Sequence, residues 1–335
     1  FVRKYGRFYP YGEVMRGLVG SFREGIVSSG IEGGFSSYLE GTLGKILMRR
    51  EPGGIWIPVS SELNYEPADG YDVVTTLDVE IGQIATKALN KKMKELGAEK
   101  GTVIVMDVKT GDVLAMVNMM RKDDSTYIEA GNFAISDAME PGSTFKTAIL
   151  LALLESGLVS LSDTVYVGEG EVQFYDATIK DVSKPDTPVI SIRRAFAISS
   201  NVAFSRLSNK FFASNPELLI NLLYQFGLDR RLDIPLPGES PQYIKKPGKK
   251  GWSGTTVPYM GIGYEVRLTP LCLTAFYNAI ANDGVFVKPR FVKAIIKGGD
   301  TIKRFESEVL QGRIARSSAI KGVQEAHCLS LIHIS

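Results

Sequence analysis

Histidine is almost absent from this chain of 335 residues, which holds only His327 and His333. Both lie in a tail, residues 327–335, that differs in character from the chain before it. From Leu329 onward the tail resembles the translated end of a sequencing adaptor, so we expect a non-native tail over residues 327–335. Without the tail no histidine remains, which excludes Ser-His-Asp triads, Cys-His dyads and histidine-ligated zinc.

Cysteine is equally scarce, and metal-ligand spacing is missing. Cys272 and Cys328 provide no disulfide framework. Cys272 lies in an apolar helical stretch, which is typical of a buried thiol. Because the acidic residues are scattered without ligand spacing, the sequence predicts no metal and no cofactor.

Long hydrophobic runs and a strong net charge are also lacking. The best apolar stretch, residues 148–154, is far too short to cross a bilayer. The net charge of +2 gives no field that favours nucleic acid, and Pro and Gly punctuate the basic stretch 245–250 as in a solvated loop. The chain begins at Phe1 inside a basic, aromatic segment. We therefore interpret it as a fragment whose missing membrane segment decides nothing about the whole gene product.

The composition that remains is that of a globular protein, with 44% hydrophobic and 23% charged residues. The length allows two domains. Residues 1–70 are rich in Gly, Ser and aromatics with weak periodicity, which indicates a loop-rich, partly β accessory region. A turn at residues 67–70 follows, and then a β-branched run over residues 73–76 that is typical of a strand.

The rest of the chain alternates between one hairpin and several helices. Asp78 is predicted to cap a helix that stops at Gly97. Strands are then predicted over residues 102–106 and 113–117. Further helices are predicted over residues 143–155, 192–211 and 270–281, and from Pro216 onward. An early hairpin without repeated βα units favours an α+β fold over a doubly wound sheet.

Ser143 and Lys146 stand at i and i+3 at the start of an apolar helix, directly after a Pro-Gly break. A serine hydroxyl is a poor nucleophile until a base removes its proton. A buried lysine can lose its charge and act as that base. The helix N-terminus also favours a developing oxyanion, so the pair predicts serine acyl transfer.

The spacing alone is weak evidence, because about one Ser-x-x-Lys is expected by chance in a chain of this length. Ser318 and Lys321 form a second match without a Pro-Gly break, which we interpret as chance. The alternative for Ser143 is a helix cap, with Lys146 in solvent.

Residues 199–201, Ser-Ser-Asn, interrupt an otherwise apolar stretch. Buried polar groups need partners, so the interruption indicates the wall of a cleft. Ser199 could pass protons between Lys146 and a leaving amine, and Asn201 could hold an amide of a substrate. The alternative is a hydrogen-bonded cluster between helices.

These motifs resemble those of class B penicillin-binding proteins. Residues 140–146 look like that family's Ser-x-x-Lys motif, and residues 199–201 look like its Ser-x-Asn motif at the expected distance. Other segments that look familiar are 227–228 with 236–239, 261–264 with 269–271, and 277–284. The resemblance covers about residues 1–326 and is closest to division-type, FtsI-like members of the Bacteroidota.

The third motif of the family, Lys-Thr-Gly, is not found where the resemblance requires it. Residues 109–111 spell Lys-Thr-Gly, but they precede Ser143 and occupy a predicted hairpin turn, where Gly is wanted for backbone reasons. The true motif is expected beyond residue 326, so this fragment by itself is expected to be inactive. Cys272 also stands where the family usually has glutamine.

The resemblance implies a transpeptidase domain over residues 71–326, an antiparallel sheet flanked by helices, that lacks its C-terminal part. Residues 1–70 would be the C-terminal part of a non-catalytic, β-containing pedestal (dimerisation) domain. The full protein would have one N-terminal anchor in the bacterial inner membrane and a periplasmic catalytic domain.

The resemblance also implies a peptidoglycan D,D-transpeptidase of septal cell-wall synthesis. Ser143 would be the nucleophile, Lys146 its base, Ser199 a proton relay and Asn201 a substrate-binding residue, with the backbone N–H of Ser143 as one oxyanion donor. Implied partners are stem peptides on a lipid-linked precursor or nascent glycan, β-lactams, a SEDS-family glycosyltransferase and division proteins, with no nucleic acid. The alternatives are an elongation-type transpeptidase, a serine β-lactamase or β-lactam sensor, and a non-catalytic cell-wall scaffold.

Overall fold

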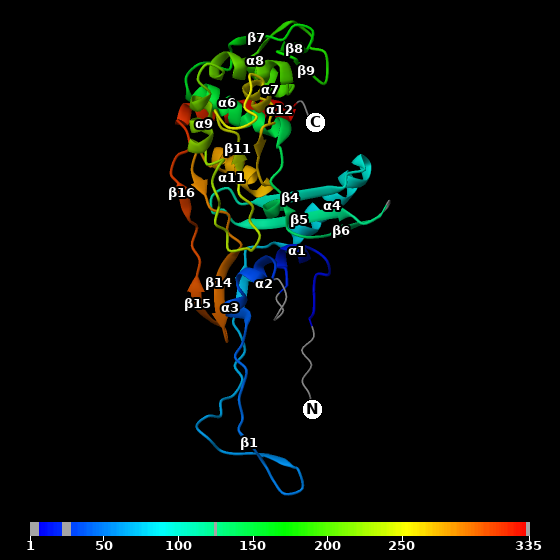
Figure 1. Ribbon diagram of the computed structural model, residues 1–335, viewed down its shortest axis with the longest axis vertical. Coiled ribbons are helices and arrows are strands. Elements are labelled where there is room, and N and C mark those ends of the chain that lie inside the picture. Colours follow the sequence, from blue (N-terminus) through cyan, green and yellow to red (C-terminus); the bar gives the residue numbers. More distant parts are fainter. Residues whose placement is uncertain (1–6, 22–27, 124–125, 333–335) are drawn as a thin grey trace.

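The computed structural model describes residues 7–21, 28–123 and 126–332. The expectations for the first six residues and for the end of the tail, 333–335, therefore lie outside the described residues. Figure 1 shows an elongated molecule with a helical lobe at one end, a sheet with its helix in the middle, and a long arm at the other end.

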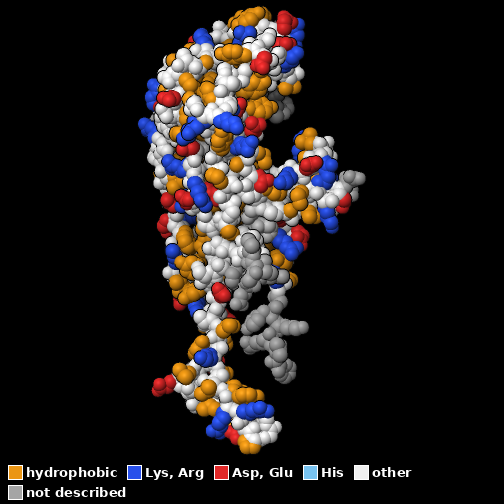
Figure 2. Space-filling model, in the orientation of Figure 1, with side chains coloured by type: hydrophobic (Ala, Val, Ile, Leu, Met, Phe, Trp, Pro, Cys, Tyr) orange, Lys and Arg blue, Asp and Glu red, His pale blue; other side chains and the backbone are white. Residues whose placement is uncertain are grey.

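The accessory region combines short helices with one extended arm. Its elements are α1 (Arg16–Val19), α2 (Gly30–Gly34), α3 (Ser36–Leu39), β1 (Met48–Arg50) and β2 (Trp56–Pro58). β1 and β2 pair antiparallel near the tip of the arm. Large apolar side chains of the arm stay exposed, Leu43 by 87% and Trp56 by 57%. Figure 2 shows hydrophobic, basic and acidic side chains next to one another on the arm. The loop-rich, partly β character was predicted, whereas helices of four or five residues leave no periodicity to read.

The β-branched run at residues 73–76 forms most of β3 (Asp72–Thr75). This strand joins a three-stranded antiparallel sheet with β14 (Val292–Lys297) and β15 (Asp300–Arg304), in the order β15-β14-β3. The sheet thus pairs residues 72–75 with a segment more than two hundred positions later in the chain, below the helical lobe in Figure 1.

A helix and a hairpin form the middle of the molecule. α4 (Val79–Leu96) is capped by Asp78, whose side chain accepts from Ile81 N, and it ends at Gly97 as predicted. β4 (Lys100–Met106), β5 (Val113–Arg121) and β6 (Tyr127–Glu129) form an antiparallel sheet.

Helices cover both faces of this sheet. On one face a Cβ at Gly101 would lie 2.8 Å from the sulfur of Met93 in α4. On the other face the buried Asn118 accepts from Ala134 N in α5 (Phe133–Ser136), which packs on α11 (Pro270–Ala281). The expected antiparallel sheet between helices is confirmed.

The helical lobe surrounds α6 (Lys146–Glu155), whose apolar side chains up to Leu153 are completely buried. A short 3₁₀ helix, η1 (Gly142–Phe145), leads into α6. Around it pack α8 (Asn201–Phe212), α9 (Pro216–Gln225) and α12 (Ser317–Ile332). The remaining elements are β7 (Thr164–Tyr166), β8 (Glu171–Phe174), β9 (Ala177–Lys180), β10 (Val189–Ser191), β11 (Tyr243–Ile244), α10 (Thr256–Met260), β12 (Val266–Arg267), β13 (Phe286–Val287) and β16 (Val309–Gln311).

The continuous helix predicted over residues 192–211 is wrong. The chain instead forms α7 (Ile192–Ala197), breaks, and restarts as α8. Ser199 adopts a left-handed conformation with φ 54°, and Ser200 caps α8 by accepting from Ala203 N. Serine side chains bond the backbone readily at helix starts, so the polar interruption is itself the helix boundary.

The beginning of the tail is part of α12, which continues through residue 332. The His327 ring lies edge-on to Phe196, with 5.0 Å between centroids, and its Nε2 is 3.2 Å from Thr147 Oγ1. Cys272 is completely buried, as predicted, and Cys328 is exposed.

Candidate active site

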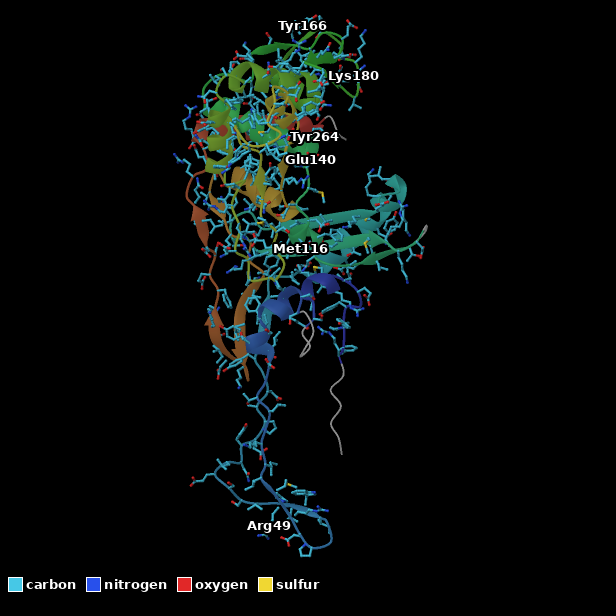
Figure 3. The ribbon with its side chains drawn as sticks, in the orientation of Figure 1. Arg49, Met116, Glu140, Tyr166, Lys180 and Tyr264 are labelled. Carbon is cyan, nitrogen blue, oxygen red and sulfur yellow. The ribbon has the colours of Figure 1, made fainter. Side chains whose placement is uncertain are left out.

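Ser143 is an exposed residue of η1, the short 3₁₀ helix that leads into α6. Gly142 before it has φ 58° and donates its N–H to Gly263 O at 3.2 Å. Glu140 Oε1 accepts from Glu265 N, so two stretches remote in sequence hold the turn. Figure 3 shows Glu140 and Tyr264 labelled at this junction.

Lys146, the predicted base, is buried, with only 1% of its surface exposed. Its Nζ lies 3.1 Å from Ser143 Oγ and 3.0 Å from Ser199 Oγ. It also lies 2.6 Å from Ser199 O and 2.7 Å from Asn201 Oδ1. The structure thus brings together all four residues predicted for the site.

Four oxygens around one nitrogen exceed what an ammonium can serve, because it has three N–H donors. A neutral amine has two N–H groups and one lone pair. It can donate to two of the Ser199 and Asn201 oxygens and accept the Ser143 O–H. Either form can therefore serve three of the four oxygens, and only the neutral form keeps a lone pair for the Ser143 proton.

The electrostatics of the site favour the neutral form of Lys146. Burial lowers the pKa of Lys146 to about 8, while the carboxylate of Asp181 opposes the shift by raising the pKa. A substantial fraction of Lys146 is then neutral slightly above neutral pH, which is what a general base requires.

The break between α7 and α8 presents the second motif to Lys146. The left-handed Ser199 turns both its carbonyl and its hydroxyl toward Nζ. Asn201 donates its amide to Lys180 O at 3.0 Å, which fixes its Oδ1 on the side of Lys146. Ser200 faces away, is 1% exposed, and bonds to Asp181.

Tyr277 of α11 was not predicted as part of the site. Its hydroxyl donates to Thr144 O at 2.8 Å and lies 2.8 Å from Thr147 Oγ1. Burial raises the pKa of Tyr277 and keeps the hydroxyl protonated. Tyr277 thereby pins the turn between Ser143 and α6. The segment 277–284 looked familiar in sequence, but nothing in its pattern placed this hydroxyl.

The two decoy motifs lie elsewhere. Gly111 of the Lys-Thr-Gly run has φ 77°, and a Cβ there would lie 2.4 Å from Lys288 O, so Gly is needed for the turn. Lys109 donates to Asn282. Ser318 and Lys321 at the start of α12 are both exposed, unlike Lys146.

In the described ranges, His, Cys, Asp and Glu form no cluster suited to a metal ion. Over the same ranges, none of the helices combines the length and apolarity needed to span a bilayer.

Comparison with known proteins adds an independent line of evidence. The family model described as penicillin binding protein transpeptidase domain matches residues 101–326. Penicillin-binding protein PbpB of Mycobacterium tuberculosis is 35% identical over 262 residues, covering 76% of this chain and 38% of that protein. Peptidoglycan D,D-transpeptidase FtsI of Buchnera aphidicola is 28% identical over 339 residues, covering 96% of this chain and 57% of that protein.

The fold is similar to solved structures as well. The apo structure of penicillin binding protein 3 from Mycobacterium tuberculosis matches with a TM-score of 0.76 at 28% identity. The match covers 95% of this chain and 68% of that one. This chain spans 38% of the mycobacterial relative PbpB and 57% of the Buchnera relative.

Proposed function

This chain belongs to the penicillin-binding protein transpeptidase family, and from that premise we propose that the complete gene product is a serine peptidoglycan D,D-transpeptidase. The observation that carries the proposal is the place of Lys146 Nζ, within hydrogen-bond distance of both Ser143 Oγ and Ser199 Oγ. One amine can thus take a proton from the nucleophile and pass it toward a leaving group.

In the first half of the reaction, neutral Lys146 takes the proton of Ser143, and Oγ attacks the carbonyl between the two terminal D-alanines. The free N–H at the helix start stabilises the oxyanion. The C–N bond breaks, an ester forms on Ser143, and the proton reaches the departing D-alanine amine through Ser199. The proton that Ser143 loses therefore leaves on the amine of the departing D-alanine.

In the second half, an amine of a neighbouring stem peptide attacks the ester. Its proton returns through Lys146 to Ser143, and the new amide is the cross-link. Asn201 is proposed to hold the substrate amide, because its side chain is fixed by Lys180 O and already faces the reacting groups. β-Lactams are proposed to acylate Ser143 by the same geometry.

The wider role is also a proposal. We infer a septal enzyme of FtsI type with stem peptides on a lipid-linked precursor or nascent glycan as substrate and a SEDS-family glycosyltransferase among its partners. It would have one N-terminal anchor in the inner membrane and a periplasmic catalytic domain. Residues 1–70 would be pedestal and 71–326 transpeptidase domain, with a non-native tail over 327–335. The Bacteroidota affinity stays a prediction from sequence.

The test is covalent labelling of the complete gene product by a fluorescent penicillin. Wild type and Ser318→Ala are expected to label equally, because Ser318 belongs to the exposed decoy motif. Ser143→Ala is expected to lose the label. Labelling that survives in Ser143→Ala would overturn the nucleophile assignment, and rapid release of hydrolysed penicillin would favour a β-lactamase.

A further inference from the structure

The end of the β8–β9 hairpin holds the Ser199–Asn201 break from behind. Lys180 is the last residue of β9, and Asp181 follows it. Asn201 donates to the Lys180 carbonyl, and Ser200 donates to the Asp181 carboxylate. Two adjacent residues on one strand end therefore bind two adjacent residues of the break.

Asp181 makes more hydrogen bonds to the break than Lys180 does. Ser200 Oγ lies 2.9 Å from Oδ2 and 3.1 Å from Oδ1, and Val202 N donates to Oδ1 at 2.9 Å. Ser200 Oγ in turn accepts from Ala203 N at 3.0 Å. Two N–H groups of the first turn of α8, which lack partners within the helix, are thus satisfied by Asp181 and Ser200.

The carboxylate sits where the N-terminal end of α8, a helix of 12 residues, favours a negative charge. Its own backbone is fixed, because Asp181 N donates to Gly170 O at 2.9 Å. The hairpin, the carboxylate and the first turn of α8 therefore form one connected unit. Ser199, with its left-handed backbone, comes immediately before that unit.

The charge of Asp181 acts on Lys146 in addition to the geometry. Ser143, Ser199, Asn201 and the ring of Phe204 surround Nζ. Tyr277 and His327 meet the neighbouring Thr147 on the other side. Among the described side chains, Asp181 is the charged group that acts on the Lys146 pKa, which it raises against the effect of burial.

We propose that Asp181 is a positioning residue for acylation, which holds Ser199 and Asn201 against Lys146 through Ser200 and the start of α8. It touches neither the substrate nor the reacting atoms. Its two effects oppose each other, since the hydrogen bonds favour the reactive geometry while the negative charge favours the protonated lysine. The inference rests on the proposed acyl-transfer function.

The test compares two substitutions of Asp181 in the complete gene product, by the second-order rate of fluorescent penicillin labelling from pH 6 to 10. Asp181→Ala removes the hydrogen bonds and the charge, and is expected to slow labelling roughly tenfold to a hundredfold. Asp181→Asn keeps a side chain that can bond Ser200, so it is expected to slow labelling less than Asp181→Ala does. Without the carboxylate its pH profile should move to lower pH, because the charge of Asp181 raises the pKa of Lys146.

Two further variants keep the test informative. Asp186→Asn removes a carboxylate from the same loop whose side chain is 86% exposed, and is expected to leave both rate and profile unchanged. Ser200→Ala is also expected to slow labelling, and the double variant by less than the two single effects combined, because both changes break the same Ser200–Asp181 contact. Melting temperatures show whether a slow variant is folded.

The outcomes separate the inference from the proposed function. Absence of labelling in wild type would overturn the transpeptidase proposal itself. Labelled wild type with unchanged rate and profile in both Asp181 variants would overturn the positioning role. A slow Asp181→Ala together with an unshifted Asp181→Asn profile would overturn the charge effect. Additive losses in the double variant would overturn the route through Ser200.

Discussion

Lys146 is the residue on which the proposed chemistry depends, because in that mechanism its protonation state decides whether Ser143 can attack. The atoms that bond to its Nζ are hydroxyl, carbonyl and amide oxygens rather than carboxylate oxygens, and the side chain is buried. A cation in such a place loses hydration without gaining a direct ion pair, which explains the lowered pKa. The exposed Lys321 of the decoy motif has no such environment.

The rate of acylation is therefore expected to rise with pH. Because burial lowers the pKa of Lys146 to about 8, the protonated, inactive form dominates below that pH and the neutral base above it. Labelling rates between pH 6 and 10 should show a rising limb with its midpoint near 8.

A variant with a permanent charge sharpens this prediction. Lys146→Arg stays protonated across this pH range. Its labelling is expected to be about 10²- to 10⁴-fold slower, which is the usual contribution of a general base. Lys321→Arg, the same change in the decoy motif, should behave like wild type. A flat wild-type profile, or an active Lys146→Arg, would show that Lys146 is not the base.

At the scale of single residues, the sequence predicted the four residues of the site, because each belongs to a short motif whose chemistry can be explained. They are Ser143, Lys146, Ser199 and Asn201. The sequence missed Asp181 and Tyr277. Each of these two residues lies outside the motifs in sequence, and only the fold brings its side chain to the site.

Among the elements, the turn that carries Ser143 depends on a close approach between two backbones. Gly142 and Gly263 both have positive φ, and Gly142 N bonds to Gly263 O. A Cβ at Gly263 would lie 2.0 Å from Gly142 O, which no side chain can tolerate without moving the turn.

Gly263→Ala is accordingly expected to slow acylation and lower the melting temperature. Gly238→Ala is the matched control, since Gly238 also has a positive φ, 94°, but a Cβ there meets nothing within 4 Å. Both variants bear the backbone cost of about 1 kcal/mol. Only Gly263→Ala adds the clash, so equal behaviour of the two in labelling and melting would contradict this account.

Helices with clear end signals were predicted well. α4 has its Asp78 cap and Gly97 stop, and α11 has Pro270 at its first position. The break between α7 and α8 was not predicted, because the apolar spacing continues across it while Ser199 and Ser200 redirect the backbone. The same polar residues were recognised as chemistry but not as a helix boundary.

At the scale of the whole molecule, the accessory region contacts the middle sheet at Glu129 of β6. Its Oε2 accepts from Arg16 N at the start of α1. Its Oε1 is buried without a partner in the described part of the chain. Burial is the main cause that raises the pKa of Glu129 to about 7.

This carboxyl should make stability depend on pH. The folded state binds a proton more tightly than the unfolded chain, so stability falls as pH rises from about 4.5 to about 7. Glu129→Gln stays neutral, and its melting temperature should exceed that of wild type at pH 8 but not at pH 4.5. Glu66→Gln, a change on the exposed arm, should show no such difference. A Glu129→Gln variant destabilised equally at both pH values would contradict the assignment.

For the whole molecule, the sequence could predict only the fold class. The α+β fold followed from one hairpin and several helices. The pairing of β3 with β14 joins residues more than two hundred positions apart, and its register depends on packing that no local pattern records. The Glu129–Arg16 contact between the accessory region and β6 is likewise a consequence of the fold.

The central claim is that Ser143 is the residue acylated. The most direct measurement is mass spectrometric mapping of the penicillin adduct in the complete gene product after proteolysis. The account predicts one penicilloyl ester, on the peptide that contains Ser143 and at its hydroxyl. An adduct on Ser199, on Ser318 or on any other residue, with Ser143 unmodified, would contradict it.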